Sequence, residues 1–388
     1  MRFSRRLTAS AVVSTMLAAG LAGCTSADDD TAGDVTEVVI GADLASGSAV
    51  DTAYARALQL RIEQINASGT LGNRQLVLRV QDNRSDPTAS LRNISTFADD
   101  PSVAAIVTGF CGECTVGAVK TINEKKLPTI ALAASDEVAN PVTDRRFVFK
   151  LGPNSQDSNA AMVAELTRTK TKRVGLLYSD DDYGNGATTA LVGELTKAGI
   201  DVTARGRVKP TATDLTQAVT TLAGTDPDAL VFLVGSDQAS AAAIGAKAAA
   251  YQGRVYFDAA AAGDMFIPQE AAAATEESTM VFTQILAIDD VIATTPAKAS
   301  RKQWFRDYTS RYGSYSGVAS FAADAADLIA EAVTKVGADR IRLRDVLETS
   351  QIDGLSGPIR LTPDNHSGLM PQALTLLVAR SGRWRLQS

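Results

Sequence analysis

Short apolar runs alternate with longer segments of helical period through most of this sequence, and this alternation constrains the fold more than any other feature. Apolar residues that recur every three or four positions predict amphipathic helices, whereas short apolar runs predict buried strands. Strands that alternate with helices favour parallel sheets covered on both faces. In the first series we expect strands at 38–40, 76–80, 103–107, 129–132 and 147–151, and helices at 54–65, 91–97 and 116–122.

A second series of the same kind follows the first. Its expected strands are at 174–178, 202–208, 229–234 and 255–257, and its expected helices are at 187–197, 215–222 and 238–251. Two series predict two lobes, and a length of 388 residues agrees with two or three domains. Beyond Gln284 we expect helices around 304–308, 321–336 and 346–347, and strands at 359–361 and 374–378 that periodicity assigns to neither lobe.

Composition excludes several classes of function. The chain has 38 basic and 44 acidic side chains and a net charge of −6, so no nucleic-acid partner is expected. His366 is the one histidine, which leaves too few ligands for a multi-histidine metal site. It lies in the turn-rich stretch 363–368, where we expect an exposed loop residue. We expect Trp304 and Trp384 to be packing residues, and we expect no metal site and no cofactor.

The N-terminal segment has the anatomy of an export signal. Three arginines within the first six residues precede an apolar stretch at 9–22, which is too short to span a bilayer stably. The following Leu21-Ala22-Gly23-Cys24 resembles the lipobox of bacterial lipoproteins, which implies that 1–23 is removed and that Cys24 is lipidated. The alternative is an ordinary secreted protein with a chance cysteine. Residues 24–36 then form an acidic tether, and the protein is expected to be extracytoplasmic and anchored to the cell membrane by its lipid.

Six loops are candidates for a binding site because they follow predicted strands. Ligands gather beyond the carboxyl ends of parallel strands, where helix N-termini present free N–H groups. The loops are 45–48, 110–115 and 133–136 in the first series, and 179–186, 235–237 and 258–264 in the second. Within 179–186, the run 180–182 does not continue into a calcium loop and Gly184-Asn185-Gly186 does not complete a dinucleotide fingerprint, so a solvated turn is expected.

Several short motifs carry a resemblance to a known family. They lie at 40–47, 63–69, 81–87, 127–130, 147–151, 181–184 and 324–325. In this order and spacing they resemble the type I periplasmic binding proteins of the branched-chain amino-acid transporter family. The resemblance implies an α/β fold of two Rossmann-like lobes with parallel sheets, joined by three crossovers, with a ligand cleft between them. It also implies a first lobe of 37–151 and 286–369, and a second lobe of 152–285 and 370–388.

The resemblance places ligand contacts on loops that the strand rule also selects. The implied residues are Cys111, Gly112, Glu113, Cys114, Ala133, Ala134, Ser135 and Tyr183, and Ser46 lies on a further selected loop. Amino-acid binders of the family place an acid near 259–262 to pair with the ligand ammonium, whereas this chain has four alanines there. Asp258, Asp264 or Glu113 could replace it, although Asp258 and Asp264 would equally serve as solvated or helix-capping residues.

Cys111 and Cys114 form a C-x-x-C motif at a predicted helix N-terminus. This placement lowers a thiol pKa and is used by thiol-disulfide oxidoreductases. Outside the cytoplasm, however, the two cysteines that remain beside a lipidated Cys24 favour a disulfide that shapes the loop.

The sequence therefore predicts a solute-binding lipoprotein of an ABC importer, a monomer and not an enzyme. Its partners would be a membrane permease and a small polar solute, with a branched-chain amino acid, an amide and an organic acid all open. Two alternatives are a ligand sensor of the same fold that acts on a receptor, and a thiol-disulfide enzyme that uses Cys111 and Cys114.

Overall fold

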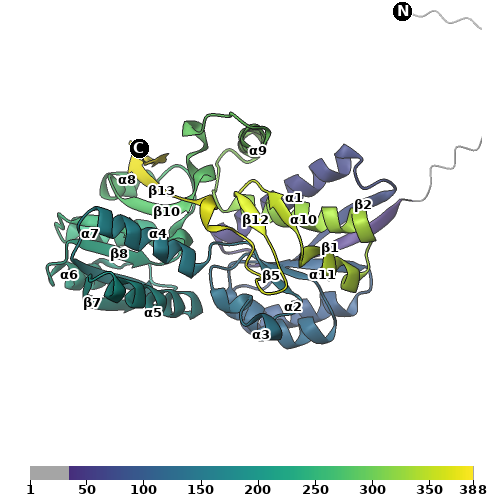
Figure 1. Cartoon of the computed structure of the whole chain (residues 1–388), viewed down its shortest axis with the longest axis horizontal. Helices are drawn as coiled ribbons and strands as arrows, with labels where there is room; N and C mark the ends of the chain where they lie inside the picture. The colour runs from purple at the N-terminus through teal and green to yellow at the C-terminus, as the bar shows by residue number, and fades with distance from the viewer. Residues whose placement is uncertain (1–34, 388) are drawn as a thin grey trace, which may run out of the picture. The chain divides into compact units, whose positions relative to one another are not determined.

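Two sheets form the frame of the computed structural model, which describes residues 35–387 (Figure 1). The predicted signal segment 1–23, the lipidation site Cys24 and nearly all of the tether lie outside the described residues. Between residues 35 and 387, no helix combines the length and the apolar character that a membrane span requires.

The first sheet is parallel throughout, with the strand order β2-β1-β3-β4-β5. Its strands are β1 (Thr36–Leu44), β2 (Arg74–Asp82), β3 (Val103–Thr108), β4 (Thr129–Ala131) and β5 (Val148–Lys150). Its helices are α1 (Ala49–Ser68), α2 (Pro87–Asp99), α3 (Gly112–Glu124), α10 (Ala319–Val336) and α11 (Arg340–Leu347). Alternate residues of β1 enter opposite cores, since Val38 and Ile40 pack with α1 and α10 whereas Val39 packs with α2 and α3.

The second sheet has the order β14-β13-β10-β9-β8-β6-β7 and is parallel from β7 to β10. Its strands are β6 (Arg173–Ser179), β7 (Asp201–Val208), β8 (Ala229–Leu233), β9 (Arg254–Phe257), β10 (Thr279–Thr283), β13 (Leu374–Arg380) and β14 (Arg383–Leu386). Its helices are α4 (Ser155–Arg168), α5 (Asp182–Lys197), α6 (Thr216–Ala223), α7 (Ser236–Ala248) and α8 (Gln269–Thr275). Ser381 and Gly382, both with positive φ, close the antiparallel β13–β14 hairpin, as two-residue turns require.

The described chain passes between the two sheets three times, as the fold prediction required. The first crossover is 151–154 after β5, the second is 284–295 after β10, and the third is 361–373 after β12. Between the second and the third lie α9 (Pro296–Tyr312) and the hairpin of β11 (Gln351–Asp353) and β12 (Pro358–Arg360). The strand predicted at 374–378 belongs to the second sheet.

The structure differs from the sequence prediction at several elements. Helix α4 and strands β10, β11 and β14 were not predicted, and α5 begins at Asp182, five residues before the predicted start. Trp304 and Trp384 are buried packing residues, as predicted.

The prediction of an exposed His366 was wrong. The side chain is fully buried and its ring lies 4.4 Å from the ring of Phe149. Its Nδ1 lies 2.9 Å from the Val148 carbonyl oxygen, and Nε2 lies 3.3 Å from Glu348 Oε1. The turn containing His366 folds over the end of β5, so a turn-rich stretch is here an internal contact between the third crossover and a strand of the first sheet.

A buried carboxylate secures the β11–β12 connection. Asp324 of α10 is fully buried, and its oxygens accept hydrogen bonds from the Leu355 and Ser356 backbone amides at 2.6 and 2.9 Å and from the Ser356 hydroxyl. Burial raises the pKa of Asp324 to about 7, although these hydrogen bonds oppose the shift.

We predict that Asp324 makes stability fall as the pH rises. Because its pKa is about 7 in the folded protein and 3.8 ordinarily, the folded state alone holds this proton between those values, so stability is lost through that window. The melting temperature should be higher at pH 6 than at pH 8, and Asp324→Asn should flatten this difference. Circular dichroism melts in steps from pH 6 to pH 8 measure it, and equal slopes in the two proteins would contradict the assignment.

Candidate ligand-binding site

Two adjacent spaces lie between the lobes and share the side chains of Phe110 and Tyr183. The space that we call the inner chamber has a volume of about 20 Å³, room for about one water molecule. It is lined by Tyr54, Phe110, Leu132, Ala134, Gly152, Pro153, Ser155, Ser158, Tyr183, Asp258, Ala259, Ala260, Phe282, Val318 and Phe321.

The second space, which we call the outer cleft, is much larger and more polar. Its volume is about 640 Å³, within the range of small-molecule sites. It is lined by residues 45–48, Val50, 84–85, Phe110, Ser179, Asp181, Tyr183, 210–213 and 235–238. Strand-end loops of both lobes thus meet here, as expected of ligand sites in parallel sheets.

Asp51 fixes the first-lobe wall of the outer cleft. Its side chain is 1% exposed, and its two oxygens accept hydrogen bonds from the backbone amides of Ala45 at 2.7 Å and Phe110 at 2.8 Å. These bonds join the loop after β1 to the loop after β3. Burial raises the pKa of Asp51 to about 6 despite the two amides.

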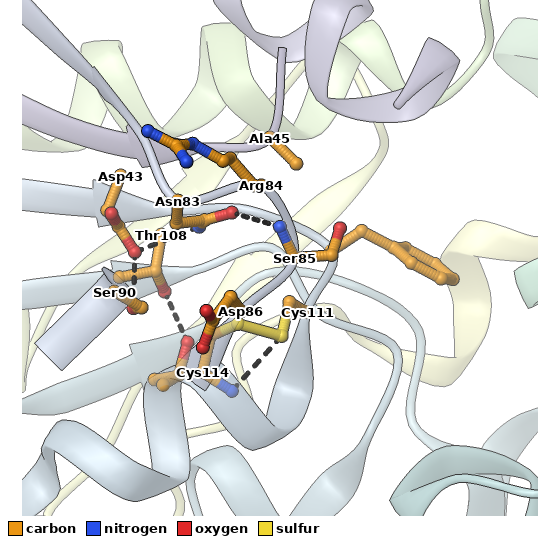
Figure 2. The surroundings of a disulfide bond; sticks show 12 residues. Asp43, Ala45, Asn83, Arg84, Ser85, Asp86, Ser90, Thr108, Cys111 and Cys114 are labelled. Atoms are coloured by element: carbon orange, nitrogen blue, oxygen red, sulfur yellow. Dashed lines mark hydrogen bonds between the residues drawn. A yellow bond between two sulfur atoms is a disulfide. The ribbon is translucent and has the colours of Figure 1, made fainter. Parts of the chain in front are cut away.

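A second buried acid, Asp43, fixes the loop at 83–86. Asp43 is fully buried and accepts hydrogen bonds from Asn83 and Ser90 (Figure 2). It accepts a third hydrogen bond from Asn93. Burial raises the pKa of Asp43, and these donors limit the rise. Asn83 in turn accepts a hydrogen bond from the Ser85 amide at 2.9 Å.

The first turn of α3 contains a disulfide between Cys111 and Cys114 (Figure 2). Cys111 is the helix N-cap, and its sulfur accepts a hydrogen bond from the Cys114 amide at 3.2 Å. Cys114 is 1% exposed, whereas Cys111 is only partly buried. This geometry suits a bond that shapes the loop after Phe110.

The second-lobe wall is built around Tyr183, near the start of α5. Asp181 caps this helix through the Gly184 amide at 2.7 Å, and a Cβ on Gly184 would overlap the Ser179 carbonyl. The run 180–182 was predicted to be a solvated turn, but the structure places it at the start of α5, with Asp181 as the N-cap residue. The Tyr183 hydroxyl donates to Asp258 Oδ2 at 2.6 Å. Burial and the adjacent Asp258 charge raise the pKa of Tyr183, so it remains a donor.

Asp258 holds the unusual acceptor of the site. It is 2% exposed, and its Oδ1 has no hydrogen-bond partner among residues 35–387. It occupies the N-cap position of the short turn Ala259–Ala261, but its side chain makes no capping bond to the described chain. Neither exposure to bulk solvent nor capping therefore accounts for this carboxylate, and an unpaired buried acceptor is costly.

The structure brings some of the residues selected from the sequence together and leaves others apart. Four of them line the two spaces: Ser46, Ala134, Tyr183 and Asp258. The others line neither space: Cys111, Gly112, Glu113, Cys114, Ala133, Ser135 and Asp264. Asp264 lines a third hollow, which shares Val50, Ser236 and Asp237 with the outer cleft. The Ser135 hydroxyl accepts a hydrogen bond from the Glu137 amide at 3.3 Å.

Two further features were not found from the sequence. Phe110 lines both spaces, and its only sequence signal was its place at the start of the loop 110–115. Glu113 of the first lobe is exposed, and partial burial together with the charges of Asp182 and Asp181 of the second lobe raises its pKa. Within the described chain, no cluster of three or more His, Cys, Asp or Glu side chains is arranged to hold a metal ion.

Comparison with known proteins agrees with this two-lobed arrangement. The sequence profile of the periplasmic binding proteins matches residues 39–383, nearly the whole described chain. The chain belongs to the periplasmic binding protein family. Its fold is that of type I proteins, as the sequence motifs indicated, since a periplasmic binding protein type 1 from Bordetella pertussis shares it with a TM-score of 0.78 at 17% identity.

Solved structures share the fold at low sequence identity. An extracellular ligand-binding receptor from Rhodopseudomonas palustris HaA2 has a TM-score of 0.82 at 20% identity, over 91% of this chain and 100% of that one. A leucine binding protein from Thermotoga maritima has a TM-score of 0.77 at 18% identity, over 91% and 98%. A solute binding protein of an ABC transporter from Rhodopseudomonas palustris BisB5, in complex with 3,4-dihydroxybenzoic acid, has a TM-score of 0.78 at 16% identity, over 90% and 95%.

A curated relative matches part of the sequence. An amino acid binding protein of Pseudomonas aeruginosa is 25% identical over 171 residues, which cover 43% of this chain. The aligned region covers 45% of that protein, so this chain matches just under half of its length.

We predict that Gly109→Ala damages the outer cleft. A Cβ at Gly109 would overlap the Asp51 carboxylate and displace it from Ala45 and Phe110. Overpacking of this kind costs about 1–3 kcal/mol of unfolding free energy, which urea denaturation measures. Gly117→Ala is the control, because nothing lies within 4 Å of its Cβ position in the middle of α3. Equal stability in the two variants would show that Gly109 is not needed for this contact.

Proposed function

We propose that this protein is the extracytoplasmic solute-binding component of an ABC importer and that it captures a small solute between two closing lobes. Membership of the periplasmic binding protein family supports a solute-binding role, and the similar ABC-transporter binding proteins support the transport role. The proposal includes a lipid anchor at Cys24, a monomeric state and no catalytic activity.

The unpartnered oxygen of Asp258 is the observation that carries the ligand class. Asp258 lines the inner chamber, and a solute that brings an N–H, an O–H or a cationic group would satisfy its unpartnered carboxylate oxygen. An amine or an amide meets this requirement directly. An organic acid meets it only if it also carries a hydroxyl or another donor, since its own carboxylate would face the Asp258 charge.

Asp258 could also replace the acid that is absent from 259–262. Amino-acid binders of the family were expected to place an acid there, whereas this chain has four alanines. In this chain the acid directly precedes the alanines, and the Tyr183 hydroxyl bonds its other oxygen. The pair would present one fixed acceptor at the boundary between the inner chamber and the outer cleft. We therefore propose that the solute donates to Asp258 and that its remaining part occupies the outer cleft.

Closure follows from how the contacts are divided between the lobes. Asp258 and Tyr183 belong to the second sheet's lobe, whereas Ala45, Ser46 and Phe110 follow strands of the first sheet. A solute that touches both walls binds the closed form more tightly than the open form, and this difference shifts the population toward closure.

We predict that donor-bearing solutes stabilise the protein and that Asp258→Asn weakens them. A ligand that binds only the folded state raises the melting temperature, so we would screen leucine and other amino acids, amides, and hydroxylated and plain benzoates. Replacing a charged acceptor by a neutral one should weaken an ammonium- or hydroxyl-bearing solute by roughly tenfold or more, which calorimetric titration measures.

Asp201→Asn is the matched control, because Asp201 at the start of β7 is exposed and lines neither space. Unchanged affinity in Asp258→Asn, or equal weakening in both variants, would remove Asp258 from the site. Stabilisation by none of these compounds would count against the proposed solute class.

A further inference from the structure

Lys150 is a buried cation in the motif 147–151, and solute binding does not use it. Its side chain is fully buried at the end of β5. Its ammonium donates to Asp136 Oδ1 at 2.8 Å, to the Pro153 carbonyl at 2.6 Å and to Asn154 Oδ1 at 3.2 Å. All three N–H donors therefore have acceptors, and two of these belong to the first crossover.

The backbone of Lys150 also connects the end of β5 to the third crossover. Its amide donates to the His366 carbonyl, and its carbonyl accepts a hydrogen bond from the Gly368 amide, both at 2.8 Å. In Figure 1 the segment that follows β12 runs beside β5. One residue thus contacts two of the three segments that must bend when the lobes move.

Asp136 continues this network into the walls of the inner chamber. It directly follows Ala134 and Ser135, and Ala134 lines the chamber. Besides Lys150, the Asp136 carboxylate accepts a hydrogen bond from the Ser155 amide at 3.0 Å. Ser155 begins α4 of the second lobe and also lines the chamber. The Asp136 carboxylate therefore bridges a first-lobe loop and a second-lobe helix.

We propose that Lys150 and Asp136 are positioning residues for solute binding: together they hold the loop at 133–136 against the start of α4 and thereby set the geometry in which the chamber closes. The inference rests on the proposed closure of the lobes. A buried ammonium that loses its carboxylate becomes an uncompensated charge, so the two groups move as a unit. Hinges are short segments that absorb backbone rotation, and this pair restricts two of them.

The experiment uses purified protein without any solute, so its result does not depend on knowing the ligand. Lys150→Met and Asp136→Asn are compared with the wild type by small-angle X-ray scattering and by amide hydrogen exchange. We expect a larger radius of gyration in both variants. We also expect exchange about tenfold faster or more at 133–138 and 151–158, because the bonds that protect these segments from local opening are lost.

Matched variants separate this effect from general destabilisation. Lys150→Arg retains the charge and should recover part of the wild-type protection, whereas Lys335→Met removes an exposed lysine paired with Glu331 and should change nothing. Lys150→Met keeps the test usable if Asp136→Asn does not fold, because Asp136 is one-third exposed and water can solvate its carboxylate once the ammonium is gone.

Two outcomes would overturn the proposal. One is unchanged scattering and unchanged exchange at 133–138 and 151–158. The other is an equal rise of exchange throughout both sheets, which would show a purely structural pair. Failure of the proposed solute class appears in a different experiment, as an absence of stabilisation by the screened compounds.

Discussion

The burial of carboxylates is the constraint on which the cleft of this protein depends, because a charge removed from water must be met by donors. Asp43, Asp51 and Asp324 are each at most 1% exposed, and each accepts at least two hydrogen bonds. In every case at least one donor belongs to a loop or to a helix that adjoins a loop. Because the buried carboxylate needs these hydrogen bonds, it fixes the backbone of that loop. Asp258 departs from this pattern, since only one of its oxygens is met within the described chain.

The same constraint explains why the lobes are rigid and the crossovers are the natural place for motion. Within each lobe, buried acids and parallel strands fix the cleft loops, and close-packed interiors do not deform gradually. Between the lobes the contacts are sparser. A Cβ at Gly235 of the second lobe would lie 3.7 Å from the Phe110 ring, an ordinary van der Waals distance, so this first-lobe ring meets the second lobe without a tight fit. Separation of the lobes would break contacts such as this one and the ring contact between Phe282 of β10 and Phe321 of α10, and it would leave both sheets unchanged.

The sequence predicted the sheets well because parallel strands buried on both faces are short apolar runs. β3 is buried at all six positions and could be located from the sequence within a residue or two. Helix α4 escaped because its buried face includes Ser158, Asn159 and Glu165, so the apolar period on which prediction depends is missing. Strand β10 is only five residues long, and it pairs with β13, which lies about ninety residues further along the chain.

The candidate site was predictable to the level of loops, because chain topology alone brings the carboxyl ends of parallel strands to one edge. The polar contacts within those loops were not predictable. Asp51 bonds the Phe110 amide across 59 positions, and Tyr183 bonds Asp258 across 75. A sequence reveals which side chains could accept a hydrogen bond. Whether a given acceptor lacks a donor depends on the positions of all its neighbours in the folded protein. The Asp258 oxygen that no described residue meets therefore emerges only in three dimensions, and it is the feature that most narrows the chemistry of the solute we propose.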